Sequence, residues 1–397
     1  MHRLALICGG ALALAAAPAS AQELRIGFMS TLSGPAAIIG NHQVNGWKLG
    51  LEHQGWTKDG DKLGDVVTKI FYADDQVKPD VGLAEAQKMV TNHKVHLIAG
   101  NIWSNVLMAV QQYAVDNKIG VMSTNAGASP MAGRACSPYF ISTSWNNDQT
   151  PEAMGRVMTE EKFKSVWLMA PNYQAGKDML AGFQRYYKGE GKVLGTTLFK
   201  INETDYQADI SKVRAEKPEA LFIFAPGGMG ISFMRQWAAS GANKEIKLYT
   251  VFTVDYLTLG PIGDAALGTY HTNYWNPEDP NPVNQKFFKE YLAKFGHRPS
   301  HFAAQSYDAP ALIAAGVKAV SGKVDDVLAL MKAMRKASYP SVRGAYQYNV
   351  NGIPIQNFYL REVVKGADDK PMIKTVRAVF TNHKDAYWEE CPAPSRF

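Results

Sequence analysis

Between Leu97 and Ser129 the chain contains two short apolar segments, and each is followed by a polar loop. A helix pattern lies between the first loop and the second apolar segment. The apolar segments Leu97–Ala99 and Ile119–Met122 predict buried strands. Between them, apolar residues over Val106–Ala114 recur at the spacing of an amphipathic helix. Strands that alternate with helices predict a parallel sheet with helical crossovers.

The two polar loops in this stretch are the first candidate site. In parallel α/β sheets, ligands bind beyond the carboxyl ends of the strands, where helix N-termini offer free N–H groups. The loops Asn101–Asn105 and Ser123–Gly127 both follow a predicted strand and both carry serine and asparagine. We therefore expect them to lie side by side at a binding site.

The N-terminus predicts a secretory signal peptide at residues 1–21. His2 and Arg3 precede an apolar run, and the A-x-A pattern at its end predicts cleavage after Ala21. Cys8 lies too early in this run to be a lipid-attachment cysteine. No later segment is apolar for long enough to predict a spanning helix. We expect an exported protein, periplasmic in a Gram-negative cell.

Two cysteines remain after removal of the signal peptide, Cys136 and Cys391. In an oxidising compartment such a pair favours a disulfide, here between the C-terminal tail and a loop near Pro138. The alternative is two unrelated thiols, and two ligands alone would make a poor zinc site.

The charge balance argues against a nucleic-acid partner. The formal net charge of +6 is spread along the chain, and no run of basic residues is interleaved with aromatic residues. The balance modestly favours an anionic ligand. The length of 397 residues exceeds what one core usually supports, so two lobes are expected.

The strand and helix patterns then repeat along the chain, which predicts two doubly wound α/β lobes. Further strands are expected at Leu24–Met29, Lys69–Ala73, Phe140–Trp145, Ser165–Ala170, Val193–Phe199, Ala220–Ala225, Lys247–Phe252, Tyr270–Trp275 and Ile373–Phe380, with a hairpin over Tyr346–Val364. Helices are expected up to Glu52 and at Pro79–Asn92, Lys177–Tyr187, Tyr206–Glu216, Ile231–Ser240, Val283–Phe295, Ala303–Val320 and Asp325–Ala337. We assign residues 22–144 and 273–345 to lobe 1, and residues 145–272 and 346–397 to lobe 2.

Four short motifs occur one after another over nearly the whole mature chain. They are Ser33-Gly34-Pro35, Asp74-Asp75, Asp205-Tyr206 and Pro226-Gly227-Gly228. In this order the sequence resembles the type I periplasmic binding proteins of ABC importers, in their leucine/isoleucine/valine-binding branch. The resemblance implies two Rossmann-like lobes joined by a three-segment hinge, with a small ligand trapped as they close.

The resemblance also implies how the ligand is held. Ser104 matches a serine that binds the ligand carboxylate in amino-acid binders, and the second such position falls at Gly127, beside Asn125. In amino-acid binders an acidic residue pairs with the ligand ammonium, and the matching position in this sequence is Thr253. The next carboxylate along the chain is Asp255. An unpaired buried ammonium would be costly, so this departure disfavours amino acids.

The loops around Trp103, Ser123 and Asn172 look more like the subgroup that binds benzoate-like and phenylpropenoid acids. Trp103, Trp145 and Tyr173 are expected to wall a flat apolar slot, while Ser104 and Asn125 hold the carboxylate. The expected ligand contacts are Ile39, Ile102, Trp103, Ser104, Asn125, Ala126, Gly127, Trp145, Asn172, Tyr173, Pro226, Gly227 and Thr253.

Each of these signals has a structural alternative. Ser104 could simply cap a helix, Trp145 could pack the hinge, and Asn172-Tyr173 could be an ordinary turn. The glycines at 227, 228 and 230 do not form a phosphate-binding motif, and Asp74-Asp75 is expected to cap a helix or anchor a loop. His93 and His96 lack further ligands in the sequence. We expect no metal, no cofactor and no catalytic set.

The expected function is therefore capture of a small aromatic carboxylate and its delivery to an ABC permease in the inner membrane, by a monomer that is not an enzyme. Binding of branched-chain or other amino acids is the alternative within the same family. An exported enzyme and a flytrap-type sensor or regulator are the alternatives from other classes.

Overall fold

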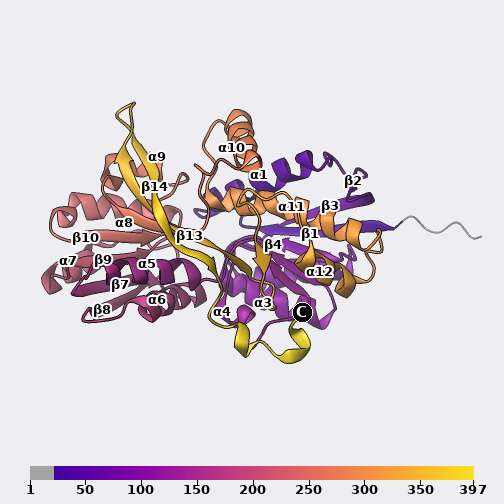
Figure 1. Ribbon diagram of the computed structural model, residues 1–397, viewed down its shortest axis with the longest axis horizontal. Helices are drawn as coiled ribbons and strands as arrows, with labels where there is room; N and C mark the ends of the chain where they lie inside the picture. Colours follow the sequence, from indigo (N-terminus) through magenta and orange to yellow (C-terminus); the bar gives the residue numbers. More distant parts are fainter. Residues whose placement is uncertain (1–21) are drawn as a thin grey trace, which may run out of the picture.

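The structure is a computed structural model that describes residues 22–397, and two α/β lobes lie side by side in it (Figure 1). The signal peptide expected at residues 1–21 lies outside the described residues. Each lobe is built on one sheet, of six strands in the first lobe and eight in the second. The expected doubly wound α/β architecture is confirmed.

The first sheet has the order β2-β3-β1-β4-β5-β6. All its neighbouring strands are parallel except β2, which pairs antiparallel with β3. Its strands are β1 (Glu23–Ser30), β2 (Lys62–Leu63), β3 (Val66–Asp74), β4 (Leu97–Gly100), β5 (Gly120–Ser123) and β6 (Phe140–Ser142). The helices of this lobe are α1 (Ala37–His53), α2 (Pro79–Thr91), α3 (Ser104–Asp116), α4 (Ser129–Ala132), α10 (Pro282–Phe295), α11 (His301–Ala319) and α12 (Val327–Lys336).

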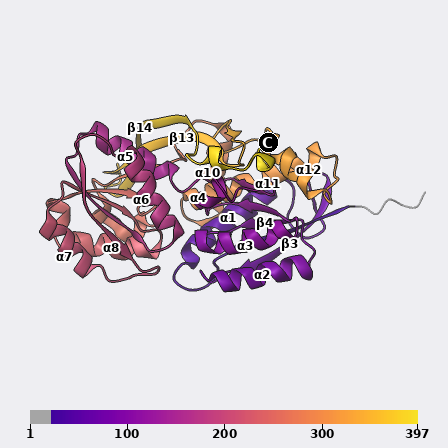
Figure 2. The same cartoon turned by 90° about the horizontal axis from the view of Figure 1, so that it is seen from below.

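Side chains alternate between the two faces of this sheet, which is why its short strands are apolar throughout. In β4, Leu97 and Ala99 pack into the core beneath α1, α11 and α12, whereas Ile98 packs into the core beneath α2 and α3. Figure 2 shows α2 and α3 side by side, away from α11 and α12. With both faces covered, only the strand ends and the connecting loops remain open to a ligand.

The second sheet has the order β12-β13-β11-β10-β9-β7-β8, with β14 paired to β13. The strands from β7 to β11 are parallel, and β13 joins them antiparallel to β11. The strands are β7 (Ser165–Pro171), β8 (Lys192–Phe199), β9 (Ala220–Phe224), β10 (Lys247–Val251), β11 (Tyr270–Asn273), β12 (Gln347–Tyr348), β13 (Pro354–Lys365) and β14 (Pro371–His383). The helices are α5 (Gln149–Glu160), α6 (Gln174–Tyr186), α7 (Gln207–Glu216), α8 (Gly228–Ala239) and α9 (Leu259–Ile262). Single 3-10 turns are η1 (Ala242–Lys244), η2 (Gly263–Ala266), η3 (Trp388–Glu390) and η4 (Ala393–Ser395).

Three local expectations need correction. Helix α5 is absent from the expected elements, although it packs against α6. Helix α6 begins at Gln174, three residues before the expected start at Lys177. Helix α8 begins at Gly228, three residues before the expected start at Ile231. Gly227 precedes it with φ of 63°, a conformation that glycine adopts without strain.

The chain passes between the lobes in the segments 143–148, 274–281 and 337–353, and Figure 1 shows the long strands β13 and β14 running along the second lobe to the junction. The strands of each sheet follow the assigned lobes, but the exact boundaries at residues 144, 272 and 345 stay a prediction. In the part of the chain that the structure describes, no helix is long and apolar enough to cross a membrane.

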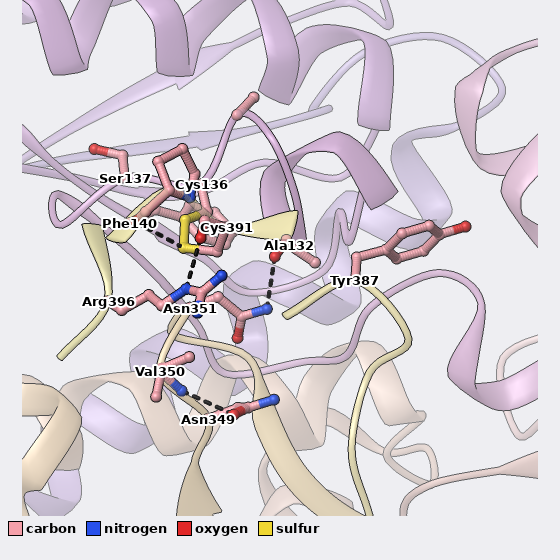
Figure 3. Close-up of a disulfide and its surroundings, with 12 residues drawn as sticks. Ala132, Cys136, Ser137, Phe140, Asn349, Val350, Asn351, Tyr387, Cys391 and Arg396 are labelled. Carbon is pink, nitrogen blue, oxygen red and sulfur yellow. Dashed lines mark hydrogen bonds between the residues drawn. A yellow bond between two sulfur atoms is a disulfide. The ribbon is translucent and has the colours of Figure 1, made fainter. Parts of the chain in front are cut away.

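After β14 the tail returns to the first lobe and is fixed there by a disulfide between Cys136 and Cys391 (Figure 3). Beside it, Asn351 donates a hydrogen bond to the carbonyl of Ala132 at 2.7 Å. The Arg335 guanidinium lies over the Phe397 ring at 4.2 Å. The last residues of the chain therefore belong to the surface of the first lobe, although β14 belongs to the second sheet.

Candidate functional site: an aromatic slot between the lobes

A narrow slot lies between the lobes, at the carboxyl ends of both sheets, and only about 20 Å³ of it is open to a water-sized sphere. The first lobe contributes the starts of α1 and α3 and the loop after β5, and the second contributes the start of α6 and the ends of β9 and β10. The residues that line it are Ile39, Ile102, Trp103, Ser104, Asn125, Ala126, Trp145, Asn147, Tyr173, Ala175, Met179, Phe224, Pro226, Phe252 and Phe302. Side chains of both lobes fill most of the slot, so a ligand ring can enter only when they move apart.

Aromatic rings form a continuous wall around the slot. Ring centroids are 5.9 Å apart between Trp103 and Tyr173, and 6.4 Å apart between Tyr173 and Phe224. Phe224 meets Phe252 edge to face at 6.4 Å, and Phe252 stacks on Trp145 at 4.5 Å. Rings at these separations attract each other, so the wall that they present to the slot is apolar and well packed.

The Trp103 ring is held in place by polar groups behind it. Its Nε1 donates to the Thr31 hydroxyl at 2.9 Å, and that hydroxyl donates to Asp75 at 2.6 Å. Burial raises the pKa of Asp75, while the hydrogen bond from Thr31 lowers it. Asp75 also accepts the backbone N–H of Val77, so the Asp74-Asp75 pair anchors this loop as expected.

Ser104 is the first residue of α3 and faces the slot. The N-cap residue is Trp103, and no side chain caps the helix, so Ser104 does not serve as its cap. The first helical hydrogen bond runs from the N–H of Leu107 to the carbonyl of Trp103, which leaves the N–H groups of residues 104–106 ahead of it. This helix end therefore offers a hydroxyl, several N–H groups and the positive end of a helix dipole.

Asn125 offers a second polar group with a fixed orientation. Its Oδ1 accepts a hydrogen bond from Gln305 at 2.7 Å, and its Nδ2 donates to the carbonyl of Ile102 at 2.7 Å. The side-chain Oε1 of Gln305 accepts from the Tyr274 hydroxyl, which fixes the direction of the whole chain of amides. The second Nδ2 hydrogen of Asn125 is then the group that it can offer to a ligand.

None of the described residues that line the slot carries a charge. The nearest carboxylate in sequence to the expected acidic position, Asp255, is 3% exposed and already has partners. It accepts the backbone N–H of Leu257 at 2.8 Å, and its other oxygen lies 3.0 Å from His301 Nδ1. Burial raises the pKa of Asp255, but its interactions with His301 and His42 and the N–H of Leu257 together hold the pKa below its usual value. Asp255 is therefore an occupied carboxylate outside the slot.

Most of the expected contact residues meet at the slot, namely Ile39, Ile102, Trp103, Ser104, Asn125, Ala126, Trp145, Tyr173 and Pro226. The other four lie outside its lining. Asn172 is exposed, and Thr253 is fully buried, where its hydroxyl accepts the N–H of Ala225 at 2.9 Å. Gly127 lies against the Trp145 carbonyl, and Gly227 lies behind Ile39.

The residues that sequence reasoning missed are Asn147, Ala175, Met179, Phe224, Phe252 and Phe302. The phenylalanines end apolar strands or begin an apolar helix, where they are indistinguishable from core residues. Asn147 lies in the segment between the lobes. The predicted strand includes Phe252, one residue past the end of β10 at Val251, so the residue that follows the predicted strand is Thr253. Nothing in the sequence would have found Phe302.

The histidines of the first lobe and a second hollow are the other candidate places for a site. Among residues 22–397, no group of three or more His, Cys, Asp or Glu side chains could hold a metal ion. His93 stacks on Phe71 at 4.1 Å, and His96 lies 3.1 Å from Asp325. A larger and more open hollow, beside Tyr339, Tyr346 and Tyr348, lies away from the strand ends of both sheets. We therefore place the candidate site at the aromatic slot.

Two α/β lobes that enclose one neutral slot between their strand ends define the architecture of a solute-binding protein. The sequence matches the family described as "Periplasmic binding protein" over residues 23–368, and the chain belongs to this family. The family implies a periplasmic location and supports binding of a small molecule in association with an ABC transporter.

Named relatives fall into two groups. The Leu/Ile/Val-binding protein homolog 6 of Brucella melitensis is 27% identical over 378 residues, which cover 93% of this chain and 94% of the relative. Among solved structures, a solute-binding protein of an ABC transporter from R. palustris in complex with benzoate is 29% identical, with a TM-score of 0.85. A solute-binding protein from Rhodopseudomonas palustris BisB5 in complex with 3,4-dihydroxybenzoic acid is 28% identical, with a TM-score of 0.84. Each of these two comparisons covers 92% of this chain and 99% of the other.

Proposed function

We propose that this protein captures a small aromatic carboxylate, of the benzoate or phenylpropenoid type, between its lobes and delivers it to an ABC permease in the inner membrane. The observation that carries the proposal is the chemistry of the slot: a wall of aromatic rings, hydrogen-bond donors at one end and no charged side chain. The benzoate and dihydroxybenzoate bound by the two structural neighbours support it.

In this proposal the ligand ring lies between Trp103, Tyr173 and Phe252, and the carboxylate meets the start of α3. Ser104 and the second Nδ2 hydrogen of Asn125 donate to the carboxylate, together with the N–H groups of the first turn of α3. A carboxylate in a slot without a cationic side chain needs several such donors, because an unpaired buried charge is costly. The helix end supplies them without a counter-charge.

Ligand binding and lobe closure are coupled in this proposal. The slot is walled by both lobes, so a ligand makes its full set of contacts only when they lie together. The ligand then shifts the population toward the closed arrangement by this difference in contacts. The boundaries that we propose for the moving lobes are residues 22–144 with 273–345, and residues 145–272 with 346–397, except that the tail fixed through Cys391 moves with the first lobe.

The remaining details belong to the same proposal. The exported chain begins after cleavage behind Ala21, works as a monomer and releases its ligand without chemical change. The slot residues include no nucleophile with an adjacent base, which supports binding without turnover. Incubation of the protein with each bound acid, followed by chromatography of the acid, would detect turnover and overturn this part.

Binding of leucine, isoleucine or valine is the second candidate, because the Brucella relatives are named as Leu/Ile/Val-binding protein homologs. It meets a physical objection in this chain. An amino acid would bring an ammonium into a slot whose described lining has no carboxylate, while Asp255 is already paired with His301. Desolvation of the ammonium without a partner would cost several kcal/mol, on the order of ~3 or more.

Thermal unfolding in the presence of each ligand tests the two candidates together. A ligand that binds only the folded state at a concentration 100 times its Kd adds about 2.7 kcal/mol to the free energy of unfolding. We expect benzoate, 4-hydroxybenzoate and cinnamate to raise the Tm and leucine to leave it unchanged. Stabilisation by leucine alone would overturn the proposal in favour of the second candidate.

A further inference from the structure

Three buried polar side chains stand in a line that ends at the slot. Asn147 Nδ2 donates to the Ser104 hydroxyl oxygen at 3.0 Å and to Asp178 Oδ2 at 2.9 Å. The three residues come from the start of α3, the first segment between the lobes and helix α6. Ser104 is 1% exposed, Asn147 2% and Asp178 5%. Water therefore has little access to these hydrogen bonds.

The direction of the two hydrogen bonds is set at Asp178. A carboxylate has no hydrogen to donate, so the group that faces it must be the NH₂ of Asn147 rather than its oxygen. Asp178 is itself fixed, because it accepts the N–H of Ser129 at 3.0 Å and the Gln174 side-chain amide at 2.7 Å. On the other side, Asn147 Oδ1 lies 3.3 Å from the N–H of Gly127. A turned-over Asn147 amide would place oxygen against Asp178 and NH₂ against that N–H.

The direction of these hydrogen bonds determines what the Ser104 hydroxyl can donate to. A serine hydroxyl has one hydrogen to donate, and Asn147 does not take it because Asn147 itself donates to the Ser104 oxygen. The Ser104 hydrogen is therefore free to point into the slot. A hydroxyl that already accepts one hydrogen bond is also a better donor of the next one.

We infer that Asp178 and Asn147 are positioning residues that keep Ser104 a hydrogen-bond donor, and that this line of bonds makes the slot select a carboxylate over the matching carboxamide. The inference rests on the proposed function and deepens it, because it assigns the choice of ligand charge to hydrogen bonds that run from the slot, which Asn147 lines, to Asp178 behind it. Asp178 itself does not line the slot.

The test compares benzoate with benzamide in the full-length secreted protein and in Asp178→Asn. The replacement amide can donate as well as accept, so the Asn147 amide is free to turn over and to take the Ser104 hydrogen. We expect the unaltered protein to prefer benzoate, and Asp178→Asn to lower the ratio of the two Kd values by about tenfold or more. Isothermal titration calorimetry measures both constants.

Asp385→Asn is the matched control. Asp385 is 2% exposed and accepts two asparagine side-chain amides at 3.0 Å, but it does not line the slot. Its replacement removes the same charge from an equally buried site. We expect a similar loss of thermal stability with an unchanged benzoate-to-benzamide ratio.

A double-mutant cycle with Ser104→Ala separates positioning from a general effect on the fold. In the Ser104→Ala background no hydroxyl is left to orient, so Asp178→Asn should change the ratio by less than about twofold. An equal change with and without Ser104, or an unchanged ratio in Asp178→Asn alone, overturns the inference. If circular dichroism shows Asp178→Asn unfolded, Asp178→Ser takes its place in the same cycle with the same criteria, because a hydroxyl at position 178 can also donate and so frees the Asn147 amide to turn over.

The failure of this inference is distinguishable from the failure of the proposed function. If the unaltered protein binds neither benzoate nor another aromatic carboxylate, the proposed function is wrong. If it binds benzoate tightly and the ratio does not depend on Asp178, only the positioning role is wrong.

Discussion

The Ser104→Ala variant probes the start of α3 directly. In the proposed complex the Ser104 hydroxyl donates one hydrogen bond to an anionic oxygen in a site closed to water. Hydrogen bonds to charged groups contribute about 1.5–3 kcal/mol. The expected loss of benzoate affinity is therefore about 10- to 150-fold, since each 1.4 kcal/mol corresponds to a factor of ten.

The same variant should leave the unliganded protein nearly as stable as before. Ser104 does not cap α3, and its oxygen accepts one hydrogen bond, from Asn147, which keeps Asp178 as its other acceptor. The cost of that lost acceptor is about 1 kcal/mol, which corresponds to a Tm decrease of less than about 4 °C. The effect on binding is thus expected to exceed the effect on folding.

Titration calorimetry with benzoate and differential scanning calorimetry without ligand measure these two quantities. Ser240→Ala is a suitable control, because it removes a half-buried serine hydroxyl from the second lobe, outside the slot. Unchanged benzoate affinity in Ser104→Ala would refute the placement of the carboxylate at the start of α3. A Tm decrease of the size expected for a lost helix cap, with affinity unchanged, would assign Ser104 a structural role instead.

Three further predictions concern the ring wall, a buried carboxylate and the disulfide. Tyr173→Leu should weaken benzoate binding about 2- to 12-fold in calorimetry, because an aromatic pair contributes about 0.5–1.5 kcal/mol beyond buried area, and a larger affinity would contradict the ring wall. Burial and the charge of Asp178 raise the pKa of Asp148 from 3.8 to about 7. The folded state then keeps a proton that the unfolded state releases, so urea titrations should show stability falling from about pH 4 to pH 7, and Asp148→Asn should flatten this slope. The bond between Cys136 and Cys391 closes a separation of 255 residues, so replacement of both by serine should lower the free energy of unfolding by up to about 5 kcal/mol. A reducing agent should reproduce that loss only in the unaltered protein.

Much of the fold follows from local patterns in the sequence. Parallel strands such as Leu97–Gly100 are buried on both faces, so they appear as short apolar runs bounded by polar loops. Helix α5 was not predicted because its apolar residues lie next to Pro151 and Gly155, which interrupt the usual sequence pattern of a helix. Gly155 faces the backbone carbonyl of Phe183 in α6, a close approach that no single-segment pattern reveals.

The candidate site could be predicted only in part. Ser104, Asn125 and Trp103 follow predicted strands, and in a parallel sheet the residues after the strands are the ones expected to contact a ligand. The opposite wall is made by apolar residues from distant segments, such as Phe224 and Phe302, whose approach depends on how the lobes meet. The pairing of Asp255 with His301 also joins distant segments, and no pattern in the sequence predicts it.

The most direct test of the account is mass spectrometry of the ligand that co-purifies with the protein from its native cells. The protein is isolated without added ligand and without denaturation, and the bound molecule is then released and identified. The account predicts an aromatic carboxylate without an ammonium group, in a ratio of one molecule per chain. A branched-chain amino acid bound at that ratio would contradict it, because the slot has no charged side chain to pair with an ammonium.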